Sequence, residues 1–204
     1  MLDHVFTDAI SALRDALREV HLERQAFEEH FQMDVLTGDV TWETSYGLPG
    51  EGLPPRIEAH ITFDWPTWSQ TTYRRWYVDE ELEEAPVIEL EIVLRIQRLA
   101  SAPDAEMVMK VLPRQGPSIG NEALERGGAT LETAYGDTLD EVAYALEVAY
   151  EGIYELAEEV LADGSNEILD QHFGALAGWI SSILVRLGDL KLEYLPPEEE
   201  AIDE

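Results

Sequence analysis

The chain has no cysteine among its 204 residues. Disulfide bonds, thiolate nucleophiles and cysteine-ligated zinc or iron–sulfur sites are therefore excluded. It also lacks an uninterrupted apolar run of the roughly 18 residues that a membrane-spanning helix needs. Its first residues include acids, in place of the basic and apolar segments of a secretion signal. These absences predict a soluble, cytoplasmic protein that makes no contact with a membrane.

Basic residues are scarce. The chain has 13 Lys and Arg against 43 Asp and Glu, which gives a formal net charge of −30. The imbalance grows towards the C-terminus, where Arg186 and Lys191 are the only bases after residue 138. Such a surface repels nucleic acid and attracts basic proteins, so we predict a basic protein partner and no direct contact with nucleic acid. Solubility, or adaptation to a salty cytoplasm, is the alternative explanation of the charge.

Motifs that hold metals and cofactors are also missing. None of the five histidines lies in an H-E-x-x-H or E-x-x-H pattern, so the sequence predicts no metal site. No glycine-rich nucleotide-binding loop follows a strand pattern, so we expect no cofactor. The chain is accordingly expected to be non-catalytic.

One stretch of the sequence is compatible with enzymatic activity. Residues 116–120 read G-P-S-I-G, which matches the G-x-S-x-G pattern of a hydrolase nucleophile elbow centred on Ser118. Asp163 or Asp170, with His172, would complete a triad in the expected order. An elbow requires a buried strand that runs directly into a sharp turn and a helix, and neither flank has that pattern. We therefore interpret residues 113–128 as an irregular loop and assign no catalytic residue.

The spacing of apolar residues changes along the chain. Steps of three and four, from Phe6 to Phe31, predict a helix that ends before Gly38. The period is then two as far as Leu112, and the short connections predict an antiparallel meander. The expected strands are Val40–Tyr46, Ile57–Phe63, Ser69–Val78, Val87–Leu99 and Glu106–Leu112, with a sixth at Ala129–Tyr135.

Steps of three and four return after a T-x-x-E capping box at residues 138–141. They predict a long helix over residues 139–162 and a second over residues 169–187, joined at Gly164 as a hairpin. The expected fold class is α+β, with an N-terminal helix, a five- to six-stranded antiparallel meander sheet and a C-terminal helical hairpin packed on one sheet face. Residues 1–195 would form a single domain, and residues 196–204 an acidic tail.

Two surfaces are candidates for partner binding. The first is an acidic face of the helix expected over residues 139–162, which carries Glu147, Glu151, Glu155, Glu158 and Glu159. The second is an aromatic patch on the second sheet face, formed by Trp65, Trp68, Arg74 and Trp76, because aromatic residues beside arginine are enriched at protein interfaces. Packing of the aromatic residues under the sheet and solvation of the acidic face are the alternatives.

Three functions follow from these patterns. The first is a non-catalytic binding protein that engages a basic protein partner, of the chaperone, inhibitor or immunity, or adaptor type, including a DNA mimic. The second is a small-ligand-binding domain with an aromatic pocket between sheet and helices. The third is a serine hydrolase at Ser118. The sequence is also compatible with a homodimer formed through the helical hairpin.

Overall fold

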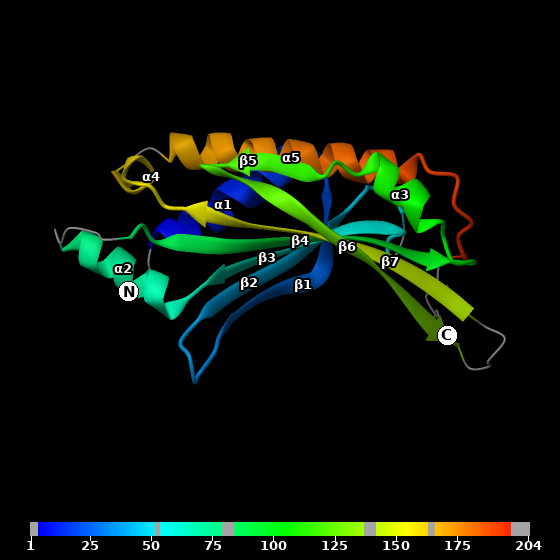
Figure 1. The fold of residues 1–204 in the computed structure, drawn as a ribbon, viewed down its shortest axis with the longest axis horizontal. Helices are drawn as coiled ribbons and strands as arrows, with labels where there is room; N and C mark the ends of the chain where they lie inside the picture. The colour runs from blue at the N-terminus through cyan, green and yellow to red at the C-terminus, as the bar shows by residue number, and fades with distance from the viewer. Residues whose placement is uncertain (1–3, 52–53, 79–83, 137–141, 163–165, 197–204) are drawn as a thin grey trace, which may run out of the picture.

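The computed structural model describes residues 4–51, 54–78, 84–136, 142–162 and 166–196. The protein has an α+β fold in which a curled antiparallel sheet carries the N-terminal and C-terminal helices on one face (Figure 1). The helices are α1 (His4–Glu19), α2 (Thr67–Tyr77), α3 (Ala105–Val111), α4 (Glu158–Ala162) and α5 (Glu167–Gly188). The strands are β1 (Glu23–Met33), β2 (Val40–Gly47), β3 (Ile57–Trp65), β4 (Val87–Leu99), β5 (Gln115–Ile119), β6 (Glu122–Tyr135) and β7 (Val142–Glu155).

The described sheet has seven strands in the order β1-β2-β3-β4-β7-β6-β5, and all neighbours are antiparallel. Strands β1 to β4 form one meander, in which β2, β3 and β4 correspond to predicted strands and β1 lies where the N-terminal helix was predicted to continue. The chain then passes through α3 to the far edge of the sheet and returns as a second meander, β5-β6-β7. The pairing of β4 with β7 joins the two. This arrangement replaces the single meander that short connections predicted.

The core lies between the sheet and the pair of helices α1 and α5. Every second residue of the central strands faces this layer, as in β4, where Ile88, Leu90 and Ile92 are buried. Aromatic rings meet there at centroid distances of 5.0 Å for Phe6 and Trp65 and 5.5 Å for Phe63 and Phe173. Helix α5 packs against α1, β3 and β5. Because the helices cover this face over the central strands, the alternate residues of the same strands form a second, open face.

The N-terminal helix ends earlier than the apolar spacing predicted. His21 adopts a left-handed conformation, with φ 59°. The backbone N–H groups of His21 and Leu22 donate to the carbonyls of Arg18 and Leu17, which is the hydrogen-bond pattern of a Schellman cap. Residues 23–33 then form strand β1. This helix end could not be predicted from the sequence, because the left-handed position after the helix is occupied by histidine and not by the usual glycine.

Two segments expected to be strands are helices. Residues 69–77 belong to α2, which buries Ser69, Gln70 and Tyr73 on one side. Residues 106–112 belong largely to α3, where the side chain of Asp104 accepts a hydrogen bond from the backbone N–H of Glu106 at 2.9 Å. Both helices follow short turns, and their length of about three turns or less left too few apolar repeats to separate period two from period 3.6.

The expected helix over residues 139–162 is wrong, and with it the helical hairpin. Residues 142–155 form β7, which pairs with β4 on one side and β6 on the other, and only the short α4 is helical. Leu146, Val148 and Tyr150 are buried at steps of two. Helix α5 ends at Gly188 as expected, and its partner on the sheet is α1. The capping box at residues 138–141 lies outside the described residues, as does the tail from residue 197 onwards.

Within the described ranges, α5 is one helix with the length and apolar composition of a membrane-spanning segment. A core helix of a soluble protein passes the same test. Phe173, Leu176, Ile180 and Leu184 of α5 are all buried in the layer between the helices and the sheet.

Candidate binding groove on the open sheet face

The open face of the sheet places three glutamates in one row. Glu91 on β4 is the direct cross-strand partner of Glu151 on β7, and Glu151 is in turn the direct partner of Glu125 on β6. Direct partners on neighbouring antiparallel strands project from the same face, with Cβ atoms about 4.5–5.5 Å apart. Like charges in such positions destabilise a sheet. No ion pair joins any of the three to another described residue.

A neighbouring row on the same face contains a compensating cation. Arg95 on β4 forms ion pairs with Glu147, its direct partner on β7, and with Glu132 on β6, at 2.9 Å for the second pair. Burial alone would lower the pKa of Arg95, but the two carboxylates raise it, and the net shift is upward. The fold therefore supplies a cation to one acidic row and leaves the next row without one.

A hollow of about 850 Å³ lies over the unneutralised row. Its acidic lining residues are Asp64, Glu89, Glu91, Glu122, Glu125 and Glu151, and the basic one is Arg126. The Arg126 guanidinium donates to the carbonyl oxygens of Met109 at 2.9 Å and Leu112 at 2.5 Å, at the C-terminal end of α3. The cation is thus held by a helix end, where carbonyl groups favour positive charge.

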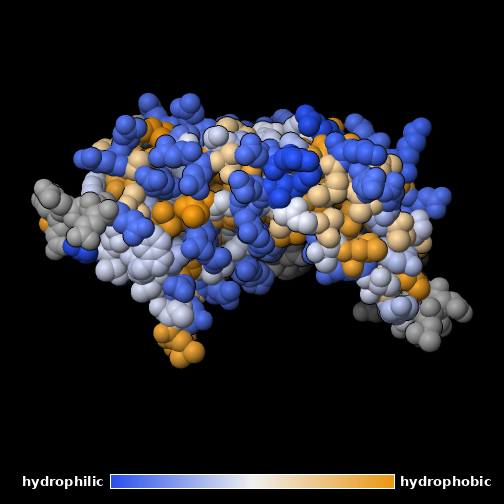
Figure 2. All heavy atoms as spheres, viewed as in Figure 1, coloured by the Kyte–Doolittle hydropathy of each residue, from blue (hydrophilic) through white to orange (hydrophobic). Residues whose placement is uncertain are grey.

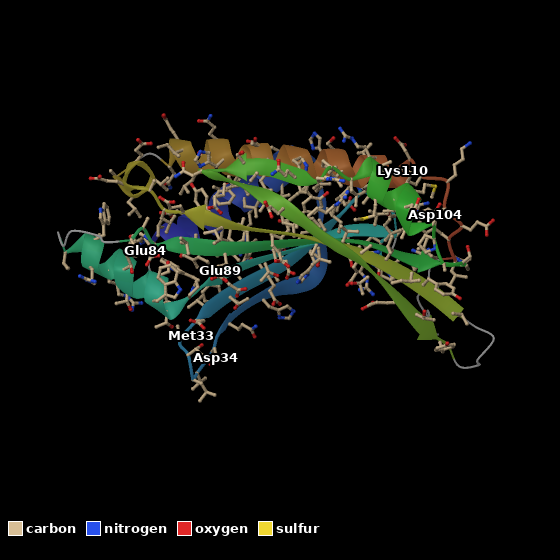
Figure 3. All side chains as sticks on the ribbon, in the orientation of Figure 1. Met33, Asp34, Glu84, Glu89, Asp104 and Lys110 are labelled. Carbon is tan, nitrogen blue, oxygen red and sulfur yellow. The ribbon has the colours of Figure 1, made fainter. Side chains whose placement is uncertain are left out.

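A second hollow, of about 460 Å³, continues the first towards the β1–β2 connection, and Asp64 and Glu89 line both. Met33, Asp34 and Glu89 are labelled on this side of the molecule in Figure 3. Backbone N–H groups of Thr37 and Leu36 donate to the Asp34 carboxylate and lower its pKa. The pKa of Asp39 is lowered in the same way, mainly by the backbone N–H of Thr67. We refer to the two hollows together as the acidic groove.

The five glutamates predicted on one helix face are divided between a strand and a short helix. Glu147, Glu151 and Glu155 lie on β7 and share its open face, because a step of four residues is even and keeps side chains on one side of a strand. Glu158 and Glu159 lie apart from them on α4. The structure also brings in residues that the sequence reasoning missed. Among them, Glu89 and Glu91 alternate with apolar residues in β4, and this alternation indicated that they lie on the polar face of the sheet. Which strand lies beside them cannot be predicted from residue spacing.

The predicted aromatic patch is divided by the structure. Trp65, expected to be exposed, is 2% exposed, and its indole N–H donates to the Ser69 hydroxyl at 3.0 Å. Trp68 is 45% exposed on α2. Trp76 is half-buried against the core, and Arg74 is exposed on the same helix. These side chains therefore do not form a patch on the second sheet face, because the segment that carries three of them is helical.

The stretch around Ser118 is neither an elbow nor an irregular loop. Ser118 is an exposed residue of β5, and Gly120, at φ 66°, begins a two-residue turn into β6. A glycine at this position is typical of a tight β-hairpin. His172, the expected triad base, lies with Nδ1 3.0 Å from the hydroxyl of Tyr154. The strand–turn–helix geometry that activates a serine is therefore absent from residues 115–135.

Among the residues that the structure describes, no group of three or more His, Asp or Glu side chains is arranged to hold a metal ion. The acidic groove presents carboxylates from β3, β4, β6 and β7 along a surface.

Comparisons with protein-family models, with curated proteins and with solved structures found no match to this chain.

Proposed function

We propose that this chain is a non-catalytic binding protein that engages a basic protein partner through the acidic groove. The observation that carries the proposal is the row formed by Glu91, Glu151 and Glu125. Direct cross-strand contacts between like charges oppose folding by about 0.2–1 kcal/mol each. A cationic side chain laid across the row would remove this repulsion, as Arg95 does in the neighbouring row.

The size and shape of the groove favour a protein segment over a small cation. The two hollows extend from β6 across β7 and β4 to the β1–β2 connection. At that end, Val35 and Leu36 are each 96% exposed, and the tip is a hydrophobic projection beside hydrophilic side chains in Figure 2. Exposed apolar residues next to complementary charge are typical of protein interfaces.

The tip is also held in place. Asp34 N–H donates to Asp39 O at 2.9 Å, and Gly38 N–H donates to Asp34 O at 2.8 Å. The hydroxyl of Thr67, in the first turn of α2, donates to Thr37 O at 2.6 Å. A surface that is ordered before binding loses less conformational entropy when a partner arrives. The type of partner that suits this arrangement is a Lys- or Arg-rich segment with apolar residues, as a cytoplasmic chaperone, inhibitor or adaptor would bind.

The experiment begins with the immobilised chain and lysate of the native host. Proteins eluted by rising salt are identified by mass spectrometry, and the retained protein is purified for titration. The variant Glu91→Gln/Glu125→Gln/Glu151→Gln is compared with Glu158→Gln/Glu159→Gln/Asp170→Asn, which changes net charge equally outside the groove. The groove variant is expected to weaken binding at least about tenfold, roughly 1.4 kcal/mol, and to reduce the salt dependence.

The control variant is expected to bind like the wild type. Equal weakening by both variants would mean that net charge alone drives association, and the groove would then have no specific role. Weakening by the control alone would place the partner on α4 and the start of α5. Retention of no protein at low salt would leave solubility as the explanation of the charge.

A further inference from the structure

Strand β6 has a long unpaired edge. Strand β5 pairs with it only as far as Glu125, and the last contact is the hydrogen bond from Arg126 N–H to Arg114 O, at 3.1 Å. Beyond a bulge at residues 126–129, seven consecutive residues, Ala129–Tyr135, pair in register with β7. No described strand lies on their other side. A regular edge of this length leaves backbone N–H and C=O groups free to pair with another strand.

Apolar side chains are exposed along the same edge. Leu131 and Tyr135 are 48% and 63% exposed, although Leu131 is the direct partner of the buried Leu146 on the helix-covered face. Every residue from 127 to 135 is exposed. The edge therefore extends past the helices, and part of the core-facing side of the sheet is uncovered there.

The edge is nearly free of charge in a chain whose net charge is −30. Residues 127–135 read G-G-A-T-L-E-T-A-Y. The single acid, Glu132, is paired with Arg95 at 2.9 Å. Two copies of so acidic a chain repel each other over most of their surfaces, and this neutral edge is a place where they can meet. Neither lysine nor proline, two residues that usually protect an edge, occurs between residues 127 and 135.

We infer that the edge of β6 over residues 129–135 is an interface for a second copy of this chain, which joins two sheets into one across a two-fold axis. An antiparallel pair of identical strands is symmetric, as a two-fold dimer requires. An axis at Leu131 sets this residue against its own copy and Glu132 against Thr130. An axis at Glu132 would set two carboxylates against each other, so the first register is favoured.

The absence of cysteine makes the register testable. A Leu131→Cys variant would place two thiols in direct cross-strand positions, where Cα atoms about 4.5–5.5 Å apart allow a disulfide. Val185→Cys is the matched control, because Val185 is also 48% exposed but lies on α5. Under mild oxidation, the Leu131→Cys chain is expected to form a covalent dimer rapidly. The Val185→Cys chain is expected to stay unlinked.

Light scattering after gel filtration gives the second measurement. The wild type at high micromolar concentration is expected at the mass of two chains, against 23.0 kDa for one, and Leu131→Lys is expected as a monomer. Val185→Lys should remain a dimer, and circular dichroism checks that both variants fold. A monomeric wild type would overturn the inference. A wild-type dimer that persists in Leu131→Lys, or equal cross-linking of the two cysteine variants, would also overturn it by placing the interface elsewhere.

Discussion

Glu151 on β7 lies directly opposite Glu91 on β4, and four residues away on the same strand face Glu147 lies opposite Arg95. The two β7 glutamates thus share a strand, a face and a side-chain type, and differ in the charge across from them. This difference allows the energetic effect of the unneutralised row to be measured within one molecule.

We predict that Glu151→Gln raises the free energy of unfolding, because it removes two like-charge contacts of about 0.2–1 kcal/mol each. Glu147→Gln is expected to lower it by about 0.2–1 kcal/mol, because it removes a partner of Arg95 at a partly exposed site. Urea denaturation at low salt measures both. The two effects should shrink together in concentrated salt, which screens surface charges.

A loss of stability in Glu151→Gln would contradict this assignment. It would mean that the Glu151 carboxylate makes a favourable contact, and the groove would then be an ordinary solvated surface. If the variant is more stable and also binds the partner less tightly, the acidic row is retained at the expense of folding.

The fold could be predicted where each element carries a clear period over many residues. Strand β4 alternates buried and less buried residues from Ile88 to Ile96, and α5 repeats apolar residues almost to Gly188. Both were predicted close to their observed bounds. The α+β class follows from these two patterns. Errors occurred where two periods coincide, as in residues 142–155, where steps of four fit one face of a helix and one face of a strand equally well.

The candidate site was less predictable because it depends on strand order. Glu91, Glu125 and Glu151 are distant in sequence, and they meet only because β7 inserts between β4 and β6. Gly120 and Asn121 were a readable hairpin signal that the G-x-S-x-G pattern obscured. The helix stop at His21 had no such signal, since a left-handed residue with a side chain is uncommon.

A second prediction concerns pH. The Tyr154 hydroxyl and His172 Nδ1 are 3.0 Å apart and join β7 to α5. Burial raises the pKa of Tyr154 to about 12 and lowers the pKa of His172 from 6.5. For the tyrosine, stability is present below its ordinary pKa of 10.0 and is lost as pH rises through about 12. For the histidine, stability is present above 6.5 and is lost as pH falls through the lowered pKa.

Urea denaturation midpoints measured across pH test the loss of stability at high pH and the loss at low pH. Tyr154→Phe should reduce the loss of stability between about pH 10 and 12, and His172→Gln should reduce the loss just below about pH 6.5. Spectroscopic titration of the phenols should show one group that ionises late and is missing in Tyr154→Phe. If the loss of stability at high pH were unchanged in Tyr154→Phe, other buried tyrosines would account for it.

The third prediction concerns the glycine beneath the acidic row. Gly152 lies next to Glu151 on β7, and a Cβ atom placed on it would lie 2.7 Å from Cδ2 of the buried Leu124. Gly152→Ala is therefore expected to lower the free energy of unfolding by about 1–3 kcal/mol through overpacking. Gly178→Ala is the matched control. Its Cβ would meet nothing within 4 Å, and helix propensity should raise stability by about 0.5–1 kcal/mol.

Thermal or urea unfolding of the two variants, together with Gly152→Ala/Leu124→Ala, distinguishes overpacking from backbone strain. The second substitution makes room for the new methyl group, so the double variant should be more stable than the sum of the single changes implies. Full additivity would show that Leu124 does not restrict this site. Glu125 and Glu151 are the chain neighbours of Leu124 and Gly152, so Gly152→Ala should also displace the acidic row and weaken partner binding, whereas Gly178→Ala should not.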